Sequence, residues 1–362
     1  MRVISAPINV FLVITELCNL SCRHCATSSP RFSQDNLKLN EWLRLLRRLV
    51  ELKVFELVIS GGEPLCYKGL FPLLEYIEGT HLHYTLNTNA TLITRETAKR
   101  LGDLQRLDGI LIGLDGSTAS VHDALRGEGV FQRTLRGIEL LKEFSESGIN
   151  LFCVVTKLNY KDLPSIAQVA GGLNVDSIQF EPLLVQGNAI HYQQELLLSL
   201  DETRKVYQTI EELSLEYGDF ISGNYLTMGG YYRDFKKWAV ELKDLPEAAY
   251  MNACNAGIEK CALRPDGWVI PCDRLYDLKV GNIRKRDIQD IWLNSERFQK
   301  FRQRFSHRIS ELRECRDCPY NRFCQGGCPA VPYYLNRKLV ARDPTSCYRI
   351  LSGEEVAHGV LK

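Results

Sequence analysis

The sequence lacks the features of an exported or membrane-spanning protein. No apolar run approaches the roughly 18 residues of a membrane span, and the start, MRVISAPINV, has neither the apolar core nor the cleavage site of a signal peptide. Charge of one sign is also lacking, because 45 Lys and Arg offset 44 Asp and Glu to a net charge of +1. This balance argues against a nucleic-acid or membrane-surface partner. We therefore expect a soluble, cytoplasmic protein that binds neither.

Cysteine, in contrast, is abundant, with 13 residues in a chain of 362. Without a secretion signal these thiols do not predict a disulfide framework, because the cytosol keeps thiols reduced. Eleven of them fall in two groups, and their spacing indicates metal binding. The other two are Cys66 and Cys153. Cys153 is expected to pack, whereas Cys66 is either a small buried hydrophobic residue or a participant in chemistry.

The first 200 residues alternate short apolar runs with amphipathic stretches. Alternation of this kind predicts βαβ units, right-handed crossovers and a parallel sheet that curls into an open barrel. The predicted strands are 9–15, 56–59, 82–87, 108–114, 150–156 and 176–181, and the clearest helices are 40–52, 131–145 and 161–172. The predicted fold class is α/β: a partial (β/α)6 barrel followed by a C-terminal, cysteine-rich, loop-dominated metal-cluster domain.

Three regions are expected along the chain: the barrel over 1–200, a helical bridge over 201–253, and the cluster domain over 254–362. The bridge begins with a helix over 202–217, for which Asp201 is a candidate N-cap. The cluster domain has little strand or helix periodicity, so we expect it to need metal in order to fold.

Unusual polar or glycine-rich segments follow every predicted strand. The carboxyl ends of parallel strands meet at one edge, where ligands bind in such folds. These segments therefore predict a single site on one rim. In chain order they are CNLSCRHC, SGGEP, NTNAT, DGSTASVHDALRG, KLN and PLLVQGNA.

The first of these segments holds Cys18, Cys22 and Cys25 in a C-x3-C-x2-C spacing. Iron–sulfur clusters are held by thiolates, usually four per cluster, so three ligands leave one iron open for chemistry. A zinc site with a distant fourth ligand is the alternative, although structural zinc sites are closed by four ligands.

This loop, together with SGGEP after the second strand, resembles the two signatures of the radical S-adenosylmethionine superfamily. The resemblance implies a 4Fe-4S cluster whose open iron is chelated by the amino and carboxylate groups of S-adenosylmethionine. Reductive cleavage of the C–S bond then yields a 5′-deoxyadenosyl radical that abstracts hydrogen from a substrate. The protein positions the substrate and excludes water.

The resemblance also implies roles around this cofactor for four residues near the two signatures. His24 occupies the position of an aromatic ring near the adenine. Gly61 and Gly62 let the backbone approach the methionine amino group, which a side chain would obstruct. Glu63 braces that turn.

Four residues further along the rim match other positions of the cofactor pocket. Asn89 and Arg126 line it in the family, and Leu184 matches an adenine contact. Gly113 departs from the pattern, because many relatives have serine there. The corresponding hydroxyl contact is therefore missing or replaced by water.

Eight cysteines form the second group: Cys254, Cys261, Cys272, Cys315, Cys318, Cys324, Cys328 and Cys347. Eight thiolates suit two four-ligand sites, and spacing alone allows two zinc sites equally well. Beside the first domain, the tail resembles the SPASM domain, which carries two auxiliary 4Fe-4S clusters. The resemblance implies three 4Fe-4S clusters in all. It assigns Cys254, Cys261, Cys272 and Cys328 to the first auxiliary cluster, and Cys315, Cys318, Cys324 and Cys347 to the second.

Asp273 directly follows Cys272 and matches a proposed catalytic base of anaerobic sulfatase maturases. A net oxidation needs a group that accepts a proton and a centre that accepts an electron, and the auxiliary clusters suit the second task. The alternative is a loop aspartate that pairs with Arg274 or caps a turn.

The substrate is least determined by the sequence. The resemblance implies oxidative modification of a ribosomally made peptide, with sulfatase-maturase-like oxidation or dehydrogenation of a small molecule as alternatives. A non-enzymatic electron-transfer or zinc-scaffold protein would explain the tail alone. An electron donor such as flavodoxin or ferredoxin is implied. Because the first strand begins near residue 9, we expect no built-in leader-recognition domain. Either a separate recognition protein presents the peptide, or the substrate needs no leader.

Overall fold

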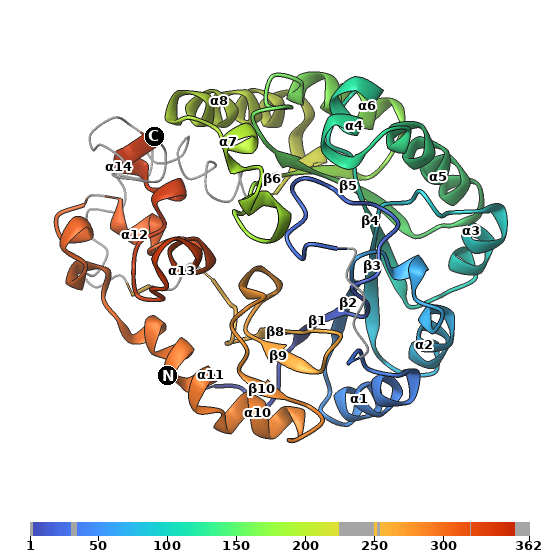
Figure 1. Ribbon diagram of the computed structural model, residues 1–362, viewed down its shortest axis with the longest axis horizontal. Helices are drawn as coiled ribbons and strands as arrows, with labels where there is room; N and C mark the ends of the chain where they lie inside the picture. Colours follow the sequence, from blue (N-terminus) through green and yellow to red (C-terminus); the bar gives the residue numbers. More distant parts are fainter. Residues whose placement is uncertain (1–2, 30–34, 224–249, 252–253, 319, 352–362) are drawn as a thin grey trace.

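A computed structural model describes residues 3–29, 35–223, 250–251, 254–318 and 320–351. Its centre is a sheet with the strand order β10-β9-β8-β1-β2-β3-β4-β5-β6-β7. The strands from β1 to β7 are parallel to their neighbours, and they curve into an open barrel with helices on the outside (Figure 1). The fold class predicted from the sequence is confirmed.

The six predicted strands of the barrel form within two residues of their expected positions. They are β1 (Asn9–Val13), β2 (Glu56–Ser60), β3 (His83–Thr88), β4 (Leu107–Gly113), β5 (Gly148–Val155) and β6 (Ser177–Pro182). A seventh strand that the apolar pattern did not predict, β7 (Ile221–Ser222), pairs with β6. It is too short for a periodicity to be detected.

The helices of the barrel lie around its outer face (Figure 1). They are α1 (Leu39–Glu51), α2 (Leu70–Glu78), α3 (Arg95–Gly102), α4 (Ala119–Arg126), α5 (Val130–Phe144), α6 (Leu163–Gly172), α7 (Gln193–Leu196) and α8 (Leu200–Tyr217). In the described ranges no helix is both long and apolar enough to cross a membrane.

Alternation along the strands separates the core from the barrel interior. In β5, Ile149, Leu151 and Val155 belong to the main hydrophobic core, whereas Phe152 and Val154 line an interior cavity. Cys153 is fully buried on the core side, as expected from its place in the strand. Successive side chains of a strand point to opposite faces, so one strand serves both the core and the site.

The bridge region is described in part. Helix α8 confirms the predicted helix, but its N-cap is Ser199 rather than Asp201. The Ser199 hydroxyl accepts a hydrogen bond from the Glu202 N–H, and the Glu202 carboxylate accepts one from the Ser199 N–H. This capping box satisfies two donors at once, which a cap at Asp201 would not. Residues 224–249 and 252–253 lie outside the described ranges, and the three-region division of the chain stays a prediction.

The tail is rich in loops, as predicted, but it also extends the barrel sheet. Strand β8 (Lys260–Leu263) pairs in parallel with β1, and β9 (Trp268–Ile270) and β10 (Gly281–Asn282) follow as antiparallel strands. The sequence analysis did not anticipate these strands. The tail also has the helices α10 (Ile288–Asn294), α11 (Glu296–Arg302), α12 (Asn321–Cys324), α13 (Ala330–Asn336) and α14 (Tyr348–Leu351).

Candidate active site

A cavity of about 440 Å³ opens among the carboxyl ends of the barrel strands. This volume lies within the roughly 300–1,000 Å³ that is usual for small-ligand sites. Ten of the residues predicted to hold clusters, cofactor or substrate line it: Cys18, Cys22, His24, Cys25, Gly61, Gly62, Asn89, Arg126, Leu184 and Asp273. The structure therefore brings five of the six rim segments together around one space. The KLN segment, residues 157–159, is not part of the cavity lining, and neither are Glu63 and Gly113.

The three-cysteine loop after β1 presents its thiols to the cavity. Burial raises the pKa of Cys18 to about 12 and that of Cys22 to about 11, and the Arg126 guanidinium opposes the rise at Cys22. The backbone N–H groups of Leu20 and Ser29 donate hydrogen bonds to the sulfurs of Cys18 and Cys25, each at 3.4 Å. Buried thiols that share one wall and accept N–H groups fit the thiolate ligands of an iron–sulfur cluster.

The two glycines after β2 permit close contact with that loop. A Cβ at Gly62 would lie 2.4 Å from the Leu17 carbonyl oxygen, and one at Gly61 would lie 2.8 Å from the Thr15 carbonyl oxygen. The Gly62 and Glu63 N–H groups donate to these same carbonyls at 2.8 Å. The glycines therefore hold the turn against the cysteine loop, and their predicted contact with the cofactor stays a prediction.

Glu63 connects the turns after β2 and β3. Its buried carboxylate accepts hydrogen bonds from the Thr88 hydroxyl at 2.8 Å and from the Asn89 N–H at 2.7 Å. Burial raises the pKa of Glu63, and these hydrogen bonds oppose the rise. The Asn89 side-chain amide in turn donates to the Asn19 side-chain oxygen at 3.0 Å, which links the second turn to the cysteine loop.

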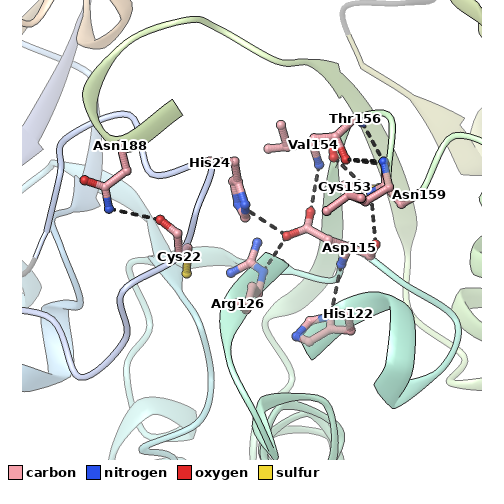
Figure 2. Close-up of polar contacts among 11 residues, drawn as sticks. Cys22, His24, Asp115, His122, Arg126, Cys153, Val154, Thr156, Asn159 and Asn188 are labelled. Atoms are coloured by element: carbon pink, nitrogen blue, oxygen red, sulfur yellow. Dashed lines mark hydrogen bonds and ion pairs between the residues drawn. The ribbon is translucent and has the colours of Figure 1, made fainter. Parts of the chain in front are cut away.

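A buried ionic cluster is centred on Asp115, two residues after the end of β4, and its members His24 and Arg126 line the cavity (Figure 2). The Arg126 Nε donates to one carboxylate oxygen of Asp115 at 2.5 Å, and the His24 Nε2 lies 3.3 Å from the same oxygen. The Val154 N–H donates to the other oxygen at 2.8 Å. Although burial raises it, the pKa of Asp115 is lowered to about 2 by the Arg126 charge and its other partners. Burial lowers the pKa of His24 to about 4.

This cluster explains the glycine at position 113. A Cβ there would lie 2.0 Å from a terminal nitrogen of Arg126, so the guanidinium occupies the space of a side chain. The Arg126 guanidinium therefore lies where the resemblance predicts a serine side chain in many relatives. The sequence analysis placed Gly113 and Arg126 in one pocket. It did not anticipate that the Arg126 guanidinium leaves no room for a side chain at position 113.

Three of the four cysteines assigned to the first auxiliary cluster pack together. Cys254, Cys272 and Cys328 belong to one cluster of side chains, which also includes Leu184 on the cavity wall. Cys261, the fourth, lies in β8 and belongs to the main core instead. The structure thus groups three of the predicted ligands and separates the fourth from them.

Among the four cysteines assigned to the second auxiliary cluster, neighbouring thiols help to raise the pKa of two, Cys315 and Cys324. Burial raises the pKa of Cys315 to about 12, and the thiols of Cys318 and Cys347 add to the rise. Burial likewise raises the pKa of Cys324 to about 12, with contributions from Cys347 and Cys315. Over the described ranges, no three His, Cys, Asp or Glu side chains converge on a point as they would around a single metal ion. The ligand roles of the cysteines therefore stay predictions.

Asp273 borders the cavity and accepts a hydrogen bond from the Cys272 thiol at 3.0 Å. Arg274, the alternative partner of Asp273, forms an ion pair with Glu181 of β6. A carboxylate beside both the cavity and an auxiliary-cluster cysteine can accept a proton there, although this role stays a prediction. Cys66 does not border the cavity.

The sequence analysis missed several polar groups of the cavity wall. The side-chain oxygens of Asn87 and Gln186 are buried without a hydrogen-bond partner, and both residues line the cavity. The Nδ1 of His24 is likewise buried without a partner. Asn87 and Gln186 lie in or beside segments that the rim pattern had singled out, but periodicity does not reveal which polar residue of a turn faces inward. Buried unsatisfied groups of this kind suit a polar ligand.

Two regions of the chain match known families. Residues 12–170 match the Radical SAM superfamily, and residues 254–319 match SPASM, an iron–sulfur cluster-binding domain. The second match includes five of the eight tail cysteines, from Cys254 to Cys318.

Similar proteins match almost the whole chain. The mycofactocin maturase MftC of Mycobacterium tuberculosis is 28% identical over 95% of this chain and 83% of its own length. An AdoMet-dependent heme synthase of Methanosarcina barkeri is also 28% identical, over 95% of this chain and 97% of its own. The crystal structure of Streptococcus suis SuiB bound to its precursor peptide SuiA has a TM-score of 0.74. At 18% identity over 95% of this chain and 76% of SuiB, that likeness supports the fold.

Proposed function

We propose that this chain, a radical S-adenosylmethionine enzyme with a C-terminal SPASM domain, oxidatively modifies a ribosomally made peptide. Its cofactors are a 4Fe-4S cluster with S-adenosylmethionine, and auxiliary iron–sulfur clusters in the SPASM domain. One observation carries the proposal: a single cavity borders both the three-cysteine loop and Asp273, which directly follows the tail cysteine Cys272. Hydrogen abstraction and removal of the remaining electron and proton can therefore act on one substrate. The similarity to a mycofactocin maturase over 95% of this chain favours a peptide.

When bound, the cluster and S-adenosylmethionine supply a carbon radical that abstracts hydrogen from an unactivated C–H bond. Cys18, Cys22 and Cys25, which line the cavity, hold the cluster in this proposal. Arg126, held by Asp115, keeps a positive charge beside Cys22, where it favours the thiolate. The unpartnered acceptors of Asn87 and Gln186 are suited to N–H or O–H donors of a bound ligand.

Asp273 completes the oxidation in this proposal by accepting a proton from the substrate after hydrogen abstraction. Its carboxylate lies at the cavity wall, 3.0 Å from the Cys272 sulfur, so proton and electron acceptors are adjacent. A general base of this kind contributes about 10²–10⁴ in rate. A small electron-transfer protein, such as flavodoxin or ferredoxin, is the proposed reductant, and a separate leader-recognition protein is a proposed partner.

Radical modification of a small molecule is the second candidate. The AdoMet-dependent heme synthase favours it, because that relative matches 95% of this chain and 97% of its own length. Both candidates use the same cavity and the same proton and electron acceptors, so they differ only in the substrate.

The test combines S-adenosylmethionine cleavage with a substrate mass measurement. Anaerobically reconstituted chain is incubated with a reductant, S-adenosylmethionine and a short precursor peptide encoded beside its gene. We expect 5′-deoxyadenosine release and a peptide that has lost hydrogen. The variant with Cys18, Cys22 and Cys25 replaced by alanine should release none.

Asp273→Asn should still release 5′-deoxyadenosine but form product about 10²-fold more slowly or worse. Asp277→Asn, at an exposed aspartate four residues away, is the matched control and should behave as the wild type. Release of 5′-deoxyadenosine with an unchanged peptide would reject the peptide and favour a small molecule. Full cluster loading without any cleavage would reject the radical function.

A further inference from the structure

Cys261 faces the wrong way to join the other cysteines of the first auxiliary set. In β8 it pairs with Val10 of β1, and Cys261, Val10 and Leu263 all belong to the main core. Ala262, between Cys261 and Leu263, packs with Phe11 and Val13 on the opposite face of the sheet. Because successive strand residues alternate between faces, Cys261 points away from the barrel interior.

The neighbouring residues Lys260 and Ala262 show which face of β8 is turned toward the cavity. Ala262 packs with Phe11 and Val13, which line the cavity, and Lys260 lies on the same face of the strand. The side chain that β8 directs to the cavity side is therefore the lysine rather than Cys261. A shift of register by one residue would be needed to exchange them, and it would move the whole strand's apolar set to the wrong face.

The other three cysteines form a group at the cavity. Cys254, Cys272 and Cys328 pack with Leu184, which is part of the cavity wall, and Asp273 borders both the Cys272 sulfur and the cavity. The remaining tail cysteines belong to the second set, and Cys261 lies in the core. Within the described residues, no fourth cysteine is grouped with these three.

We propose that Cys254, Cys272 and Cys328 alone hold the auxiliary cluster next to the cavity, and that its fourth iron takes an oxygen ligand from the cavity side. That oxygen belongs either to the Asp273 carboxylate or to a bound substrate or solvent molecule. Cys261 is a core thiol and not a ligand. The inference concerns the clusters of the SPASM domain and does not depend on which substrate the enzyme modifies.

A non-thiolate ligand has a consequence for the chemistry. Replacing cysteine ligands with less strongly donating ones raises the reduction potential of an iron–sulfur cluster, as in Rieske centres. A higher potential suits a cluster that accepts an electron from a substrate radical.

The test uses the full chain with Cys18, Cys22 and Cys25 replaced by alanine, so that only auxiliary clusters remain. This parent should hold about eight irons per chain, from two four-iron clusters. Adding Cys261→Ala should leave the iron and sulfide content and the EPR spectrum of the reduced clusters unchanged. Adding Cys272→Ala, at a second buried cysteine, should remove up to half of the iron. Loss of iron in Cys261→Ala equal to that in Cys272→Ala, with unchanged circular dichroism, would overturn the proposal.

A second measurement decides the matter if Cys261→Ala does not fold. Cyanide is titrated into the unmodified parent and into its Asp273→Ala variant, and the EPR spectrum is recorded. A new signal in the parent supports an exchangeable solvent or substrate ligand, and a signal only in Asp273→Ala supports the carboxylate as the ligand. Unchanged spectra in both proteins would mean that cysteine closes the cluster, and the proposal would be wrong.

Discussion

Removing the Asp115 carboxylate should destabilise the protein far more than breaking an ion pair on its surface. Asp115 is fully buried and Arg126 is 6% exposed, so Asp115→Ala leaves the guanidinium buried without its partner. Loss of one member of a buried pair costs about 3–5 kcal/mol. The Val154 N–H also loses its acceptor, but neighbouring effects of this kind are not additive. We therefore expect the free energy of unfolding to fall by about 3–5 kcal/mol.

Urea denaturation followed by far-ultraviolet circular dichroism measures this change. All variants carry alanine at Cys18, Cys22 and Cys25, so that the nearby cluster does not contribute. The control is Glu75→Ala, which breaks the exposed Arg100–Glu75 pair of 3.0 Å. Such surface pairs contribute about 0.2–1 kcal/mol.

A double variant distinguishes an unpaired charge from simple loss of packing. If the cost comes from the isolated guanidinium, Asp115→Ala combined with Arg126→Met should be more stable than Asp115→Ala alone, because the buried charge is gone. The reasoning is refuted if Asp115→Ala costs no more than Glu75→Ala, or if the double variant is less stable than the single one.

Two further predictions follow from the rim and its buried histidines. Gly62→Ala should lower the free energy of unfolding by about 1–3 kcal/mol and reduce iron loading, because its Cβ would lie 2.4 Å from the Leu17 carbonyl oxygen. Gly171→Ala in α6, whose Cβ would meet nothing within 4 Å, should be neutral or slightly stabilising in the same urea titration. Burial lowers the pKa of His122 to about 4, below its ordinary 6.5, so the unfolded chain binds more protons between these values. Stability should therefore be intact above pH 6.5 and fall as the pH drops toward 4, by up to about 1.4 kcal/mol per pH unit for this group. His122→Gln should flatten that slope, and an unchanged slope would contradict the assignment.

The local sequence pattern predicts an element correctly where the element is long enough to show its own apolar periodicity. The strands from β1 to β6 form within two residues of their expected positions, because each is an apolar run long enough for its period to show. The gathering of five of the six rim segments around one cavity also follows from sequence, since parallel strands end at the same edge. The 3-residue and 2-residue spacings of Cys18, Cys22 and Cys25 indicated metal before any geometry was known.

The strands of the tail could not be predicted from local periodicity. Strands β8, β9 and β10 have between two and four residues each, which is too short for a period to appear. The pairing of β8 with β1 joins residues about 250 positions apart, and no local pattern encodes which edge of the sheet is free. The N-cap of α8 lies two residues before the predicted one. Ser199 and Asp201 are both residue types that favour N-caps, and only the capping box with Glu202 shows that Ser199 is the cap.

The sequence by itself thus determined the barrel, its rim and the two groups of thiols, because repeated apolar spacing and close cysteine spacing are local properties. Only the tertiary structure decided which of those residues meet. It placed the Arg126 guanidinium in the space above Gly113, and it directed Lys260 rather than Cys261 to the cavity side of β8. Both outcomes depend on which face of a strand is turned inward. That choice is made by the burial of the whole sheet, not by the residues beside each cysteine.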